Sequence, residues 1–129
     1  MTKLEHIEYW KVSSEKDLPT VELLFDKGHY PQALFFGHLV LEKILKAHWV
    51  KDNDDNIPPK THNLTKLAEQ TNLVLGSDDL QFLGKMNVYQ LEGRYHDYIF
   101  SLYKTTKQER SVELLIQVKN LQLWLTNQL

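Results

Sequence analysis

Hydrophobic side chains recur every three or four positions along most of the chain, which is the spacing of one face of an α-helix. No stretch alternates hydrophobic and polar residues with the period of two that a half-buried strand shows. The pattern predicts helices over about residues 3–27, 30–50, 64–71, 78–92 and 108–127. We therefore expect an all-α protein, an up-and-down antiparallel bundle of four to five helices.

The first helical stretch contains a proline, Pro19. Proline inside a helix removes one backbone hydrogen bond and clashes with the preceding turn. We expect either a kink or a short helix followed by a second helix whose first residues are capped by Ser14 or Asp17. Gly28 directly follows Lys27, and a glycine in this position is typical of a helix C-terminus.

The middle of the chain is interrupted by residues that favour turns. Residues 51–60, KDNDDNIPPK, are predicted to form a loop, after which Thr61 or Asn63 can cap the third helix. Gly93 is predicted to end the fourth helix. Residues 94–106, which are polar and aromatic, are read as mostly irregular.

The second helix is hydrophobic on almost every side, so it is expected to be central or to contact a partner chain. Its main face is predicted to comprise Ala33, Leu34, Gly37, Leu41, Ile44, Leu45 and His48. The expected face of the fourth helix is Leu80, Leu83, Asn87 and Leu91. In the last helix Leu114, Val118, Leu121 and Leu125 form one stripe, and Val112, Ile116 and Leu123 form its neighbour.

Length and composition point to one domain spanning residues 1–129. The formal net charge of −2 argues against an extended basic surface, so any nucleic-acid contact must come from a local patch. The absence of cysteine excludes disulfides and thiolate metal sites. No hydrophobic run approaches the ~20 residues that span a bilayer, and the N-terminus lacks a signal-peptide pattern. We expect a cytoplasmic protein without membrane contact.

Three segments, in order, carry a resemblance to a known family. The first contains Trp10, Asp17-Leu18, Leu23-Leu24, Gly28, Tyr30-Pro31, Ala33, Glu42-Lys43 and Lys46-Ala47. The second contains Thr61-His62-Asn63-Leu64 and Leu67-Ala68. The third contains Asn87, Tyr89 and Arg94-Tyr95-His96-Asp97. Together these segments resemble the HEPN domain, named for higher eukaryotes and prokaryotes nucleotide-binding.

This resemblance implies a helical bundle that forms a homodimer and binds a nucleotide or RNA. Family members are often encoded beside a minimal nucleotidyltransferase, in pairs that resemble toxin–antitoxin systems, and others are metal-independent endoribonucleases. Ribonuclease members carry an arginine and then a histidine, with four to six residues between the two. Here Ile99, Phe100 and Ser101 occupy those positions after Arg94, and His96 stands where the non-nuclease pattern usually has proline. The ribonuclease motif is therefore incomplete.

Arg94 is the first candidate site residue, because an exposed guanidinium after a helix can bind a phosphate through two hydrogen bonds. The alternative is a salt bridge from Arg94 to Asp97 or Glu42 that holds the loop. His96 is a candidate general base, although adjacent residues such as His96 and Asp97 usually point in different directions. Tyr95 is one of several tyrosines near Arg94 that could stack on a base or close the end of the bundle.

Charged residues of the second helix form the other half of the expected site. Lys46 could contact a nucleotide phosphate, with Glu42 contributing, and the plainer alternative is a solvated helix face with one Glu42–Lys46 pair. His38 is expected to be a buried core histidine, and His62 is expected to make a cap or loop contact. The six histidines lack the spacing of metal ligands, so no metal or other cofactor is predicted.

Three functions follow from these patterns. The first is a non-catalytic HEPN-like module that forms a homodimer and binds a nucleotide, RNA or a nucleotidyltransferase partner near Arg94. The second is an endoribonuclease in which Arg94 and His96 are catalytic. The third is a domain that serves only oligomerisation, through the excess hydrophobic surface of the second and last helices. Lys104, Lys107 and Arg110 form the local run of positive charge best suited to contact an RNA backbone.

Overall fold

The computed structural model describes residues 1–92 and 108–129, and five helices and no strand occur within these two ranges. The helices are α1 (Lys3–Asp26), α2 (Tyr30–Asp52), α3 (Leu64–Glu69), α4 (Ser77–Glu92) and α6 (Gln108–Asn127). The all-α bundle expected from the hydrophobic pattern is confirmed. The predicted bounds agree closely for the last helix and for α4, whereas α3 ends two residues earlier than expected.

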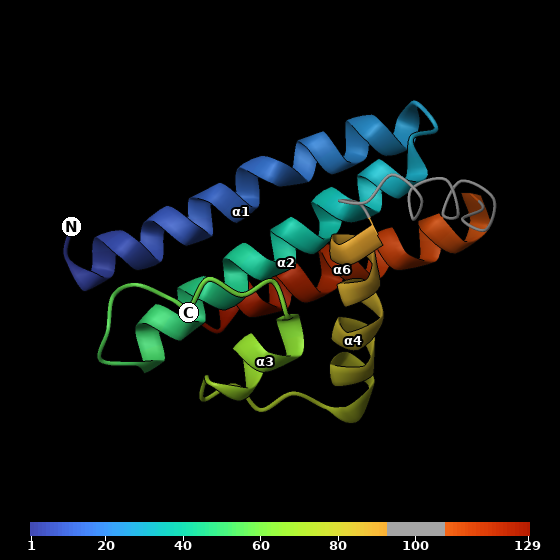
Figure 1. Ribbon diagram of the computed structural model, residues 1–129. Coiled ribbons are helices and arrows are strands. Elements are labelled where there is room, and N and C mark those ends of the chain that lie inside the picture. The colour runs from blue at the N-terminus through green and yellow to red at the C-terminus, as the bar shows by residue number, and fades with distance from the viewer. Residues whose placement is uncertain (93–107) are drawn as a thin grey trace.

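Helix α2 is the centre of the fold and contacts all the other described helices (Figure 1). Helix α1 runs antiparallel along it, α6 lies along another side, and α4 crosses the bundle steeply (Figure 1). Because neighbours surround α2, hydrophobic residues on almost all of its sides can be buried. The expectation that this helix is central is therefore confirmed.

Helix α1 is one continuous helix with Pro19 inside it, so the alternative of two separate helices is wrong. Its N-terminus is capped instead by Thr2, whose side chain accepts a hydrogen bond from the backbone of Glu5. Ser14 is buried and donates a hydrogen bond of 2.7 Å to the backbone oxygen of Val40. Asp17 forms a 2.6 Å ion pair with Lys43 of α2. These contacts hold α1 against α2, and tertiary packing of this kind can keep a helix continuous through a proline.

The core forms where α2 meets α1, α4 and α6, and most predicted hydrophobic positions lie in it. On the face predicted for the fourth helix, Leu83 is buried as expected, but Leu80 is 39% exposed. In α4, the buried positions are Phe82, Leu83 and Met86, which places a different side of the helix against α2 and α6.

The segment between α2 and α4, which contains α3, is held in place by side chains that accept hydrogen bonds from its backbone amides. Asn63 caps α3 by accepting a hydrogen bond from the amide of Lys66 at 3.2 Å, which confirms one of the two predicted caps. The side-chain oxygen of Asn87, on α4, accepts a hydrogen bond of 2.9 Å from the amide of Leu64. This contact holds the start of α3 beside the C-terminal half of α4.

Candidate functional site

A stripe of three charged or titratable residues runs along the otherwise apolar helix α2. His38, Glu42 and Lys46 are spaced by four residues, so they lie on one side of the helix. All three are buried, with Glu42 only 4% and Lys46 only 8% exposed. The predicted Glu42–Lys46 pair exists, but the expectation that it lies on a solvated face is wrong.

The carboxylate of Glu42 binds groups from two directions. Its Oε1 accepts a 2.7 Å hydrogen bond from Nδ1 of His62, which comes from the loop before α3. Its Oε2 accepts a 3.2 Å hydrogen bond from Nζ of Lys46. We call His38, Glu42, Lys46 and His62 the Glu42 cluster. A buried carboxylate is strongly unfavourable unless it is paired and hydrogen-bonded, and these contacts supply both.

Helix α1 closes the cluster on the side away from the loop. Nζ of Lys46 lies 5.2 Å from the centre of the Trp10 ring, a distance suited to a cation–π interaction. Trp10 therefore stabilises the lysine charge where water is largely excluded. The charges of Glu42 and Lys46 cancel formally, so the buried pair adds no net charge to the site.

His38 holds the loop before α3, which carries His62 and which we call the histidine loop, against α2. Its Nε2 donates a 2.9 Å hydrogen bond to the backbone oxygen of His62. Burial lowers the pKa of His38 to about 4, although Glu42 and this hydrogen bond act in the opposite direction. His38 is therefore neutral near pH 7 and serves as the core histidine that the sequence predicts.

An open hollow of about 450 Å³ adjoins the cluster at the C-terminal half of α4. We call it the Asn87 hollow, and its lining residues are Lys60, Thr61, His62, Asn63, Asn87 and Gln90. The side chain of His62 is 39% exposed, so it links the buried carboxylate with this hollow. The hydroxyl, amide, imidazole and ammonium groups are suited to hydrogen bonds with phosphate oxygens or base edges.

The Glu42–His62 contact defines what the imidazole can do. A histidine that donates from Nδ1 to a carboxylate is held in one tautomer and one orientation. The other ring nitrogen is then the proton acceptor, as in carboxylate–imidazole pairs that perform general acid–base chemistry. The arrangement can therefore bind a polar ligand and can also move a proton.

Of the site residues proposed from the sequence, the structure describes Glu42 and Lys46. Glu42 and Lys46 lie together in the interior, beside the hollow rather than in its lining. The remaining candidates, Arg94, Tyr95, His96 and Asp97, lie outside the described residues, as do Lys104 and Lys107. Lys43 forms the ion pair with Asp17 that joins α1 to α2, a contact that the sequence did not predict. Arg110 is exposed and pairs with Glu113 at 3.4 Å.

Sequence reasoning missed the link between His62 and Glu42. Twenty residues and the 51–60 loop separate the two side chains, so no local spacing connects them. One signal was available: His38, Glu42 and Lys46 recur at i, i+4 and i+8 on a helix that is otherwise hydrophobic. A polar stripe on a central helix must find partners from elsewhere in the chain.

Comparison with known proteins gives one match. No curated protein and no solved structure matches the chain. Within the described residues, no helix combines the length and hydrophobicity needed to cross a bilayer. A family model described as the HEPN domain matches residues 7–126. That match covers nearly the whole sequence, including α2, the histidine loop and α4, and the chain therefore belongs to the HEPN domain family.

Proposed function

We propose that this protein is a nucleotide- or RNA-binding module whose ligand occupies the Asn87 hollow. The observation that carries the proposal is this polar hollow, backed by the Glu42 cluster and placed along the last two turns of α4. Arg94 follows the last residue of α4 by two positions in the sequence. We propose Arg94 as the phosphate-binding group, with Tyr95 and Asp97 contributing to the same site.

Lys46 and Glu42 receive a different role from the one that their charges first suggested. Both are buried, and each is the other's partner, so a ligand in the hollow meets His62 before it meets either of them. We propose that the pair positions His62, while the lining residues contact the ligand. A buried, fully paired network is suited to such a task because its geometry is rigid.

Calorimetric titration of the full chain with adenosine nucleotides and with a short single-stranded RNA tests this function. We expect the wild-type protein to bind. Arg94→Ala should lower the affinity by roughly 10- to 100-fold, because this corresponds to the free energy that hydrogen bonds to a charged group contribute. Lys16→Ala is the control, because it removes an exposed positive charge from α1, outside the lining of the Asn87 hollow. Equal affinity in wild type and Arg94→Ala, or no binding of either ligand, would contradict the proposal.

We also propose that the protein acts as a homodimer and as the partner of a minimal nucleotidyltransferase in a toxin–antitoxin-like pair. Family membership supports both, and so does the outer face of α6, where Ile116 is 52% and Leu123 is 59% exposed. Sedimentation should show a dimer that Ile116→Asp weakens. Ile57→Asp, in a loop residue that is 67% exposed, should leave the mass unchanged. Co-expression and co-purification with a minimal nucleotidyltransferase tests the second partner.

The Glu42–His62 pair favours one further candidate function, that of an endoribonuclease. In this proposal Arg94 stabilises the charge that develops on the phosphate, and either His96 or His62 moves the proton. Incubation with RNA in EDTA tests it, comparing wild type with His96→Ala and His62→Ala. Cleavage lost in one histidine variant would identify the proton-transfer residue, and intact RNA with wild-type protein would rule the activity out.

A further inference from the structure

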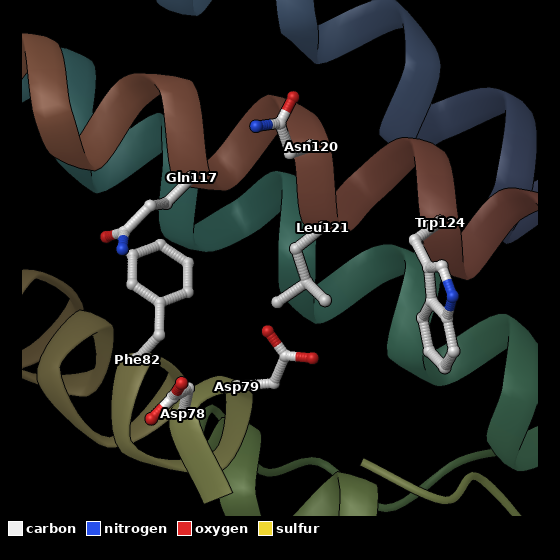
Figure 2. A pocket seen from close by; sticks show the side chains of 7 residues that line it. All are labelled: Asp78, Asp79, Phe82, Gln117, Asn120, Leu121 and Trp124. Atoms are coloured by element: carbon white, nitrogen blue, oxygen red, sulfur yellow. The ribbon is translucent and has the colours of Figure 1, made fainter. Parts of the chain in front are cut away.

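The other end of α4 carries a second surface of opposite character. A hollow of about 360 Å³ lies between the first two turns of α4 and the side of α6 that faces them (Figure 2). We call it the Trp124 groove, and its lining residues are Asp78, Asp79, Phe82, Gln117, Asn120, Leu121 and Trp124. Nothing in the proposed nucleotide site uses these residues.

The hydrophobic part of the groove consists of Phe82, Leu121 and Trp124, and its other lining residues are polar or acidic. Phe82 and Leu121 form its floor, where each is only 6% exposed, and the indole of Trp124 stands at one end with 39% exposed (Figure 2). A second hollow of about 270 Å³ also contacts Trp124 and is lined partly by Leu73 and by Val74, which is 89% exposed. The indole is thus a hydrophobic ridge accessible from two sides.

The charge in the groove is negative. Asp78 is exposed and Asp79 is half-buried, and no ion pair with either is found among the described residues. Figure 2 shows the Asp79 carboxylate directed toward Leu121, between Phe82 and Trp124, whereas the Asp78 carboxylate points away. Both aspartates lie in the first turn of α4, where a negative charge interacts favourably with the helix dipole. This explains why aspartate occurs at these positions, but it does not explain why an exposed indole lies opposite them.

These observations define the chemistry of an occupant. Two carboxylates repel a phosphate, so the groove does not suit the nucleotide or RNA proposed for the other end of α4. A guanidinium fits better: it can stack on the indole of Trp124 while it donates hydrogen bonds to the Asp79 carboxylate. Neighbouring aliphatic side chains of the same segment can cover Leu121 and the hydrophobic surface around Val74.

We infer that the Trp124 groove is a docking site for a protein segment that presents an arginine flanked by hydrophobic residues. The arginine side chain lies between Asp79 and Trp124, and the flanking residues lie against Phe82, Leu121 and Val74. The module then has two recognition surfaces, a polar one at the C-terminal end of α4 and an acidic, aromatic one at its N-terminal end. Charge complementarity and the exposed indole select the occupant.

The test uses the peptide acetyl-Leu-Arg-Leu-amide and its citrulline counterpart, which keeps the shape of arginine but carries no charge. Both are titrated into the full ¹⁵N-labelled chain while the three indole N–H signals are followed by NMR, with Trp124 assigned from Trp124→Phe. We expect the arginine peptide to shift the Trp124 indole signal and the Asp79 amide signal, and the citrulline peptide to shift neither. Asp79→Asn should weaken binding of the arginine peptide by ~10-fold.

The matched control is Asp54→Asn, which removes one exposed carboxylate from the loop after α2, outside the groove. It should leave the affinity unchanged. The inference is overturned if the arginine peptide causes no shift at Trp124, if both peptides bind equally, or if Asp54→Asn and Asp79→Asn have the same effect. Each result is independent of nucleotide binding, which is measured at the other end of α4.

Discussion

At the scale of single residues, one buried carboxylate, that of Glu42, organises the polar cluster beside α2. Glu42 holds His62 and Lys46 at 2.7 and 3.2 Å, and neither the carboxylate nor the lysine has water as a substantial alternative partner. Removing one member of such a pair leaves an uncompensated charge inside the protein. Stability and the geometry of the proposed site should therefore depend on the same side chain.

Glu42→Gln should lower the free energy of unfolding by about 3 kcal/mol, because Lys46 stays buried without its counter-charge. Urea denaturation measures the loss. Asp17→Asn is the control: the Asp17–Lys43 pair is more than 20% exposed on both sides, so its loss should cost about 1 kcal/mol or less. The double variant Glu42→Gln/Lys46→Met should recover part of the stability. Equal losses in the two single variants would contradict the account.

His38 should make the stability depend on pH. Burial lowers its pKa from 6.5 to about 4 in the folded protein, so between these values the unfolded chain binds a proton that the folded protein does not. Stability should therefore fall as the pH is lowered from 6.5 to 4, by about 3 kcal/mol from this residue. Burial lowers the pKa of His48 as well, which adds to the loss in the same direction.

Urea denaturation between pH 4 and pH 7 tests this dependence. His38→Gln should show a smaller decrease in stability than wild type over this range, because the buried imidazole is gone. His29→Gln, which changes an exposed histidine, should follow the wild-type curve. Parallel curves for wild type and His38→Gln would show that His38 does not carry the effect.

At the scale of helices, hydrophobic spacing predicted well where each helix lies in the sequence, but it predicted poorly which side of a helix packs against the others. The last helix was placed correctly because its stripes are regular and long. The alternative of two separate helices at Pro19 was wrong. The local cost of the proline is visible in the sequence, whereas the contacts that compensate it, Ser14 with Val40 and Asp17 with Lys43, join different helices. The buried side of α4 was misassigned because Leu80 and Phe82 are both hydrophobic, and only packing against α2 and α6 decides between them.

Substitution by alanine should change the stability in opposite directions at two glycines, Gly28 after α1 and Gly37 within α2. Gly28 follows α1 with φ of 78°, a conformation that disfavours a side chain, so Gly28→Ala should cost about 1 kcal/mol. Gly37 lies inside α2, where an added Cβ would meet Val118 at an ordinary contact distance of 3.5 Å. Gly37→Ala should raise stability by about 0.5–1 kcal/mol through helix propensity. Thermal unfolding measures both, and a destabilised Gly37→Ala would show that α2 and α6 are packed too tightly there.

At the scale of the whole molecule, the two ends of α4 offer different chemistry. Amide, hydroxyl and imidazole groups line the hollow at its C-terminal end, and carboxylates with an indole line the groove at its N-terminal end. The sequence predicted the helical scaffold and the family, but it could not place His62 on Glu42, since the contact depends on how the 51–63 loop returns to α2. It also gave no indication that Asp79 and Trp124 share a groove.

The central claim is that a nucleotide binds in the Asn87 hollow. The most direct measurement is a series of ¹H–¹⁵N correlation spectra of the full chain during titration with adenosine monophosphate. The account predicts shifts at the amides of residues 60–63 and at the side-chain amides of Asn87 and Gln90, with the Trp124 indole signal unchanged. Shifts centred on Trp124, or an unchanged spectrum at millimolar nucleotide, would contradict it.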